Sequence, residues 1–169
     1  MRRRHRRDVP DRRDRAAAGH PMPLSISAVT SADVDVLLPL LRAYCDFYRV
    51  DPTDDALRAL IRALLDNPGE GLQLIARDGD TPVGFATVYW TWQTLYAARV
   101  GVLNDLYVVP DVRGGGTGRA LIAHCRALCA ERGAAKLVWE TAPDNTVAQR
   151  LYDGIGAEKS TWLTYELDA

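Results

Sequence analysis

The residues best suited to chemistry form a glycine-rich run between two arginines, Arg113-Gly-Gly-Gly-Thr-Gly-Arg119. An apolar run over 102–109 precedes it, and a helical pattern follows from Arg119 to Arg132. Strand, glycine turn and helix make an anion site, because glycine lets backbone N–H groups turn toward a phosphate and the helix start adds partial positive charge. The run therefore predicts that a phosphorylated molecule binds there.

Two familiar phosphate motifs do not fit this run. A P-loop needs Lys and a hydroxyl residue after its last glycine, and the chain has Arg119-Ala120 there. A dinucleotide fold needs a third glycine where this chain has Arg119, and more chain after the acidic Glu140 than this sequence contains.

The spacing Arg-x-x-Gly-x-Gly is met by Arg113, Gly116 and Gly118. With it, the sequence resembles the GNAT superfamily of acetyl-CoA-dependent N-acyltransferases, in which this loop holds the pyrophosphate of coenzyme A. Two further pieces carry the resemblance: Leu103-Asn-Asp-Leu-Tyr-Val108 before the loop and Asn145–Ala157 after it. All three occur in family order over roughly residues 24–169.

The resemblance implies where acetyl-CoA binds as co-substrate. In the family, the strand before the loop diverges from the next strand, and the pantetheine arm pairs with its exposed backbone. The implied coenzyme contacts are Leu106, Tyr107, Val108, Arg113, Gly114, Gly115, Gly116, Thr117, Gly118, Arg119 and Asn145. Thr117 and Asn145 are equally well read as helix caps. The scattered His and Cys residues predict no metal site.

The family's second signature ends in Tyr152, which we expect to be the general acid, because a phenol stays protonated at neutral pH and can donate to a leaving thiolate. Packing against Leu151 and Trp139 is its alternative role. Asp105 is the candidate base, directly or through water, and a structural carboxylate is its equal alternative. The strand resembles that of spermidine/spermine acetyltransferases, where a Glu-Asp pair stands in place of Asn104-Asp105.

Aromatic residues are the candidates for the acceptor site. Aromatic faces attract cations by about 0.5–2 kcal/mol, so a wall of them suits an amine. Core packing explains the same residues equally well. The candidates are Tyr44, Tyr48, Trp90 and Trp92, with Glu140 as a nearby carboxylate.

Composition is that of a soluble globular protein: 47% of the 169 residues are apolar and 25% are charged. No long apolar run is present, so we expect no membrane contact, and three unpaired cysteines favour the cytoplasm. Eight Arg and three Asp make residues 1–22 a basic leader, which we expect to be disordered, with no nucleic-acid role. The alternative is that translation starts at Met22.

Alternation of strand and helix patterns predicts one three-layer α/β domain over 24–169. The resemblance implies a central mixed, mostly antiparallel sheet of six or seven strands, with diverging central strands and helices on both faces. The expected strands are 24–29, 72–77, 83–92, 100–109, 136–141 and 159–166. The first expected helix follows a capping box at Thr30, and Pro39 marks either a kink in it or its late start. The other expected helices cover 54–65, 119–132 and 145–155.

These features predict an N-acetyltransferase that moves an acetyl group from acetyl-CoA directly to a primary amine of a small molecule, polyamine-like or other. A protein lysine or N-terminal amine is the alternative acceptor, and a non-catalytic acyl-CoA sensor is the alternative of another class. We leave open a homodimer through the last strand or the aromatic hairpin.

Overall fold

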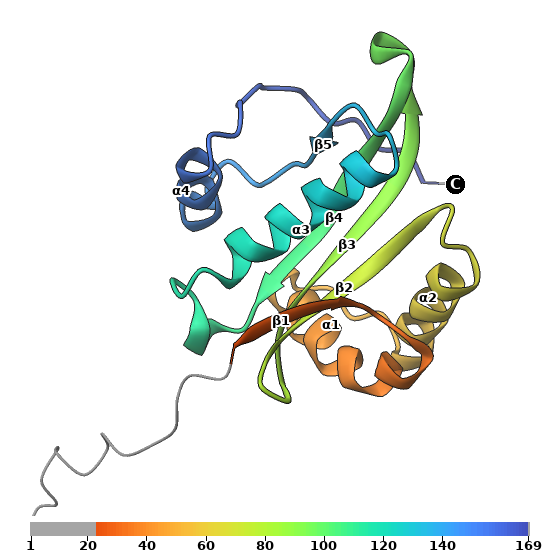
Figure 1. Ribbon diagram of the computed structural model, residues 1–169, viewed down its shortest axis with the longest axis vertical. Helices are drawn as coiled ribbons and strands as arrows, with labels where there is room; N and C mark the ends of the chain where they lie inside the picture. The colour runs from red at the N-terminus through yellow and green to blue at the C-terminus, as the bar shows by residue number, and fades with distance from the viewer. Residues whose placement is uncertain (1–22, 169) are drawn as a thin grey trace, which may run out of the picture.

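A computed structural model describes residues 23–168, so the predicted leader 1–22 lies outside the described residues. These described residues form one five-stranded sheet in the order β1-β2-β3-β4-β5, with helices on both faces (Figure 1). The strands are β1 Leu24–Ala28, β2 Gly71–Asp78, β3 Thr81–Gln93, β4 Ala98–Val108 and β5 Leu137–Val138. The first four pair antiparallel, and β5 runs parallel to β4.

The helices are α1 Val34–Tyr48, α2 Asp54–Asp66, α3 Thr117–Glu131 and α4 Thr146–Gly154. Short 3-10 turns occur at Ser31–Asp33, Thr94–Tyr96 and Pro110–Val112. The predicted capping residues stand before α1, where the Thr30 N–H donates to the Asp33 carboxylate at 2.8 Å. A late start at Pro39 is wrong, because α1 begins at Val34 and continues through the proline.

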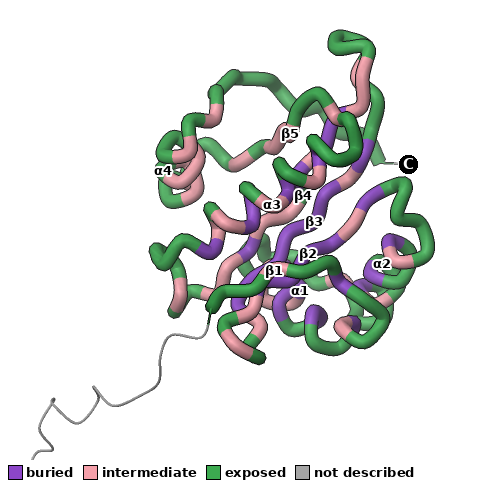
Figure 2. The backbone as a smooth tube through the Cα atoms, viewed as in Figure 1, coloured by how far each residue is buried: buried purple, intermediate pink, exposed green. Residues whose placement is uncertain are grey.

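Two apolar cores lie on opposite faces of the sheet (Figure 2). Under α1 and α2, Ile75, Phe85 and Tyr107 of neighbouring strands pack against leucines of the helices. On the other face, α3 packs its buried stripe of Leu121, Ile122, Cys125 and Cys129 on β2–β4. The predicted three-layer α/β architecture is confirmed.

The last part of the chain departs from the prediction. β5 has two residues rather than the expected 136–141, and the expected strand 159–166 has no regular structure and is exposed throughout. The described residues therefore form five strands instead of six or seven. The two-residue β5 offers too short a backbone ladder for a further strand to pair with, although 159–166 contains large apolar side chains.

Candidate active site

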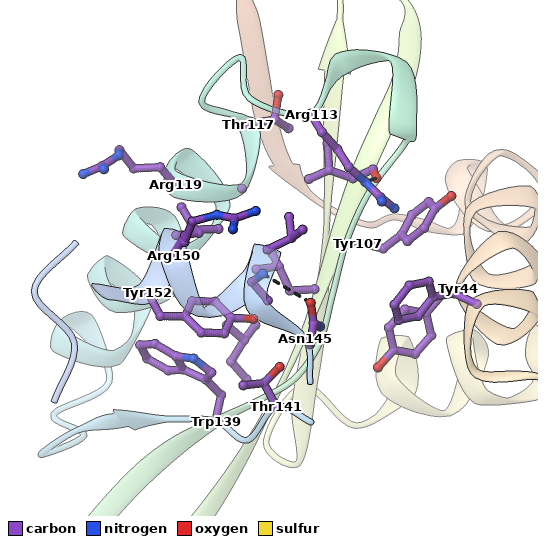
Figure 3. Close-up of a pocket in the computed structure, with 18 of the residues that line it drawn as sticks. Tyr44, Tyr107, Arg113, Thr117, Arg119, Trp139, Thr141, Asn145, Arg150 and Tyr152 are labelled. Atoms are coloured by element: carbon purple, nitrogen blue, oxygen red, sulfur yellow. Dashed lines mark hydrogen bonds between the residues drawn. The ribbon is translucent and has the colours of Figure 1, made fainter. Parts of the chain in front are cut away.

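β4 and β5 separate after pairing over only two residues. Leu137 and Val138 pair only with Gly101 and Val102, and the segment after Val138 then leaves β4. A cavity of about 510 Å³ fills the opening (Figure 3), with walls from β4, the glycine-rich loop, the segment 139–141, α4 and the end of α1. The predicted divergence thus creates a site of the size that holds small ligands.

A one-residue bulge interrupts β4 just before the backbone groups that face this cavity. Thr87 of β3 opposes Asp105, but Val88 opposes Leu103, so Asn104 is the extra residue. Val109 donates to Val83 of β3 at 3.0 Å, and backbone direction alternates along a strand. Leu106 and Val108 therefore point their N–H and C=O groups toward the open edge.

The glycine-rich loop ends in a helix start with free amides. Gly114 and Gly116 have φ of 84° and 96°, which L side chains rarely adopt. The first helical bond of α3 runs from Ala120 N–H to Gly116 C=O at 2.9 Å, so the amides of 117–119 have no partner within the helix. Gly116 is the N-cap and Thr117 is the first helical residue, so the capping role considered for Thr117 is wrong.

Three arginines line the cavity and do different things. Arg113 donates from Nε to the Val108 carbonyl at 2.9 Å and lies over the Tyr107 ring. Arg119 donates to the Gly154 carbonyl at 3.1 Å and points away from the cavity, whereas Arg150 points into it (Figure 3). Arg113 and Arg150 therefore hold charge where a pyrophosphate would lie against the loop amides.

The second signature helix faces the same cavity. The Asn145 side-chain oxygen accepts the Ala148 N–H at 3.2 Å, so this residue caps α4, and it also lines the cavity. Tyr152, two turns along, packs edge-on against Trp139 at 5.3 Å between ring centres. Its hydroxyl points into the cavity toward Thr141 and Asn145 (Figure 3). Burial raises the pKa of Tyr152, which keeps this phenol protonated.

Aromatic side chains of α1 close the other end of the cavity. Tyr44, Phe47 and Tyr48 line it, and their rings form edge-to-face pairs at 5.0 Å between centres. Tyr44 packs further onto Phe85 of the core, whereas Phe47 and Tyr48 are 55% and 48% exposed. Tyr44 therefore both packs in the core and lines the cavity. Phe47 and Tyr48 have exposed ring surface that a ligand can contact.

Asp105 does not line the cavity. It stands on the α1 side of the sheet in a row with Gln73 and Thr87, whose side chains form a buried hydrogen bond at 3.3 Å. The Asn104 amide donates to its carboxylate at 3.0 Å. Burial, and next the charge of Asp105, raise the pKa of Tyr44, so this carboxylate lies close behind the Tyr44 phenol. Glu140, in contrast, lines the cavity and is exposed.

The two tryptophans predicted for the acceptor wall lie elsewhere. Trp90 and Trp92 share a face of β3, as their spacing predicted, but that face is covered by α3 rather than α1. Trp90 is buried beneath Arg132, and Trp92 is 71% exposed next to Arg99, beyond the end of α3. Strand alternation alone does not tell which helix covers a face, so the sequence could not separate these possibilities.

Several cavity residues escaped the sequence prediction, among them Phe47, Trp139, Thr141 and Arg150. A Cβ on Gly118 would stand 3.0 Å from Leu151 Cδ2, tighter than ordinary van der Waals contact, so glycine here helps α4 to pack closely on the loop. That contact brings Arg150 beside the phosphate end. The available signal was a basic residue in the second signature helix, two positions before the expected acid Tyr152.

Within residues 23–168, no helix is long and apolar enough to cross a membrane, and no three His, Cys, Asp or Glu side chains cluster as metal ligands would. The three cysteines, Cys45, Cys125 and Cys129, are buried and unpaired.

An opened sheet, a loop of free amides and a phenol facing the same cavity are the architecture of an acyltransferase that uses a coenzyme A thioester. Residues 37–157 match the family described as Acetyltransferase (GNAT), and the chain belongs to that family. It is accordingly an acyltransferase, and enzymes of this family use acetyl-CoA.

The chain is similar to several N-acetyltransferases. It is 31% identical to the uncharacterized N-acetyltransferase YhfO of Bacillus subtilis, over 84% of this chain and 95% of that protein. The aminoglycoside N(6')-acetyltransferase type 1 of Stenotrophomonas maltophilia is 31% identical, covering 66% and 74% of the two chains. The thialysine N-epsilon-acetyltransferase of Mus musculus is 24% identical, covering 85% and 91%. A solved structure of a probable acetyltransferase superposes with a TM-score of 0.76 at 27% identity, over 86% and 97%.

Proposed function

We propose that the protein transfers the acetyl group of acetyl-CoA directly to a primary amine of a small molecule. One observation carries the proposal: a single cavity joins the phosphate loop to an end lined by Phe47, Tyr48 and Glu140. The first end suits a diphosphate, and the second offers aromatic faces and a carboxylate to an ammonium group. Relatives named for aminoglycoside and thialysine acetylation support a small amine as acceptor.

At the loop, the amides of 117–119 with Arg113 and Arg150 bind the pyrophosphate of the coenzyme. The backbone of Leu106 and the N–H of Val108, whose carbonyl accepts from Arg113, pair with its pantetheine arm, as a strand added to a sheet edge would. Asn145 retains its side-chain NH₂ for the same arm, because only its oxygen caps the helix. The bound thioester supplies an activated acetyl group.

The transfer itself needs a neutral amine at the thioester carbon. The acceptor ammonium first loses one proton to a carboxylate or to water; the nitrogen then attacks, the N–C bond forms and the C–S bond breaks. Tyr152 donates its proton to the departing sulfur and is restored by the second proton that the nitrogen gives up. The products are an amide and a free thiol, with one proton released.

Two carboxylates stand at the amine end for the first proton. Glu140 lines the cavity and accepts a proton directly, whereas Asp105 lies behind Tyr44 and acts through a water or by holding that phenol in place. An Asp105→Asn variant with full activity from pH 6 to 9 would leave Asp105 a structural role alone. A Glu140→Gln variant is the matched comparison.

The function is tested by incubating the protein with acetyl-CoA and a panel of amines, with free thiol as the readout. The panel contains a diamine, a basic amino acid, an aminoglycoside and a peptide with an exposed lysine. We expect thiol release with one class of small amine. Release with the peptide alone would make a protein the acceptor, and coenzyme binding without any release would make the domain a sensor.

A further inference from the structure

A second cavity of about 500 Å³ adjoins the first at its amine end. The two cavities share the side chains of Phe47, Tyr48, Asn145 and Val147, and no residue of the loop 113–119 reaches the second one. A ligand whose reactive amine lies in the first cavity would therefore extend its other end into the second.

Opposite charges line this second cavity. Arg49, at the end of α1, stands on one wall, and Asp144, in the segment before α4, stands on the other. Within residues 23–168 they pair neither with each other nor with another charged side chain. The other carboxylates near α1 differ, since Asp51 and Asp54 pair with Arg42.

The backbone gives no reason for an arginine at position 49. Arg49 ends α1 in the left-handed region with φ of 58°, where glycine is usual and another residue costs about 1–2 kcal/mol. Its N–H bonds to the carbonyls of Cys45 and Asp46 are backbone bonds that any residue except proline makes. A side chain kept at a strained position is a pointer to function.

We infer that the second cavity binds the α-ammonium and α-carboxylate groups of a free basic amino acid, whose side-chain amine accepts the acetyl group. This inference rests on the proposed function. A guanidinium binds a carboxylate with two parallel hydrogen bonds, and a carboxylate binds an ammonium. Arg49 and Asp144 thus match the two charges of the amino acid, while Phe47 and Tyr48 lie between the cavities against its alkyl chain.

Other amines match this pair of charges less well. A diamine or polyamine places a second cation near Arg49 with no group for the guanidinium to bind. A lysine inside a protein has neither α-charge, because both groups are in amide bonds. The arrangement therefore selects the free amino acid against both.

Four acceptors that share one alkyl amine test the inference: lysine, cadaverine without the carboxylate, 6-aminohexanoate without the α-amine, and Nα-acetyl-lysine methylamide with neither charge. We expect kcat/KM for lysine to exceed each of the others by about tenfold or more, since each loses a charge-assisted hydrogen bond. Arg49→Gln should lower kcat/KM about tenfold for lysine and 6-aminohexanoate but leave cadaverine unchanged. Asp144→Asn should lower kcat/KM about tenfold for lysine and cadaverine but leave kcat/KM for 6-aminohexanoate unchanged.

Arg126→Gln, on the exposed side of α3, is the matched control and should leave all four acceptors unchanged. Lysine no better than cadaverine, or an equal loss for every acceptor in Arg49→Gln, would overturn the inference while the acetyltransferase proposal stands. No thiol release with any amine would defeat the proposed function itself. Calorimetric titration of lysine into the protein with coenzyme A then tests the second cavity separately. If lysine does not bind, or binds equally well to Arg49→Gln, the inference about the second cavity is overturned.

Discussion

The two ends of the cavity are built in different ways. The proposed phosphate end rests mainly on one continuous stretch, 113–119, whose backbone amides and glycine conformations shape it, with Arg150 of α4 beside it. The amine end is made of side chains from α1 and from the segment before α4, about a hundred residues apart in sequence. A site built from the backbone of one stretch can be predicted from the sequence, whereas a site built from side chains distant in sequence can be recognised only once the fold is known.

We expect the largest effect on activity from a substitution at Tyr152, which lies where the two ends of the cavity meet. Tyr152→Phe removes the proton donor to the sulfur but keeps the ring that packs on Trp139. We expect kcat to fall about 100-fold, the lower range for acid catalysis, with little change in coenzyme affinity. Steady-state kinetics and coenzyme titration measure the two. Tyr96→Phe, in the β3–β4 connection, is the control, and an undiminished kcat would exclude Tyr152 from proton transfer.

A change at Gly116 breaks the phosphate end alone. Gly116→Ala has room for its methyl group but puts a side chain at φ of 96°, at a cost of about 1–2 kcal/mol. The amides then turn, and we expect the Kd for coenzyme A to rise about tenfold, measured by calorimetry. Gly69→Ala is the control, because its Cβ also meets nothing within 4 Å and its φ is not positive. Equal affinities in both variants would contradict an amide-built phosphate site.

Phe47→Leu alters the amine end alone. It removes an aromatic face next to the acceptor but keeps apolar volume, so KM for the amine should rise about threefold or more while coenzyme Kd stays constant. Leu95→Ala, on the exposed β3–β4 connection, is expected to change neither. A parallel rise in coenzyme Kd would mean that Phe47 serves both ends and that the two ends do not act separately.

High pH tests the burial of the phenols around the cavity. Burial raises the pKa of Tyr44 and of Tyr152, so the folded protein retains protons that the unfolded chain releases near pH 10. Their contribution to stability is complete below pH 10 and is lost as pH rises through the raised values. Urea unfolding should therefore show falling stability above pH 10, with a shallower fall in Tyr44→Phe. Identical slopes would show that Tyr44 is not buried from solvent.

What could be predicted from the sequence follows the same division. The loop and the placing of Asn145 and Tyr152 at one helix follow from local patterns, the diverging strands follow from the family resemblance, and the fold confirms the architecture. Trp90 and Trp92 were assigned to the acceptor wall because alternation gives a common face but not the helix that covers it. The strand 159–166 was predicted from composition, but pairing depends on a partner edge, and β5 supplies two residues.

The bulge at Asn104 gives β4 one residue that its pairing with β3 does not use. Deleting that single residue would leave Leu103 opposite Val88 and Asp105 opposite Thr87 in an unbroken ladder, so Leu106 and Val108 would still face the opening and every later side chain would keep its side of the sheet. β4 can therefore lose one residue at this point without a shift of register, and what the sheet would lose is the local bend and extra twist that a bulge provides.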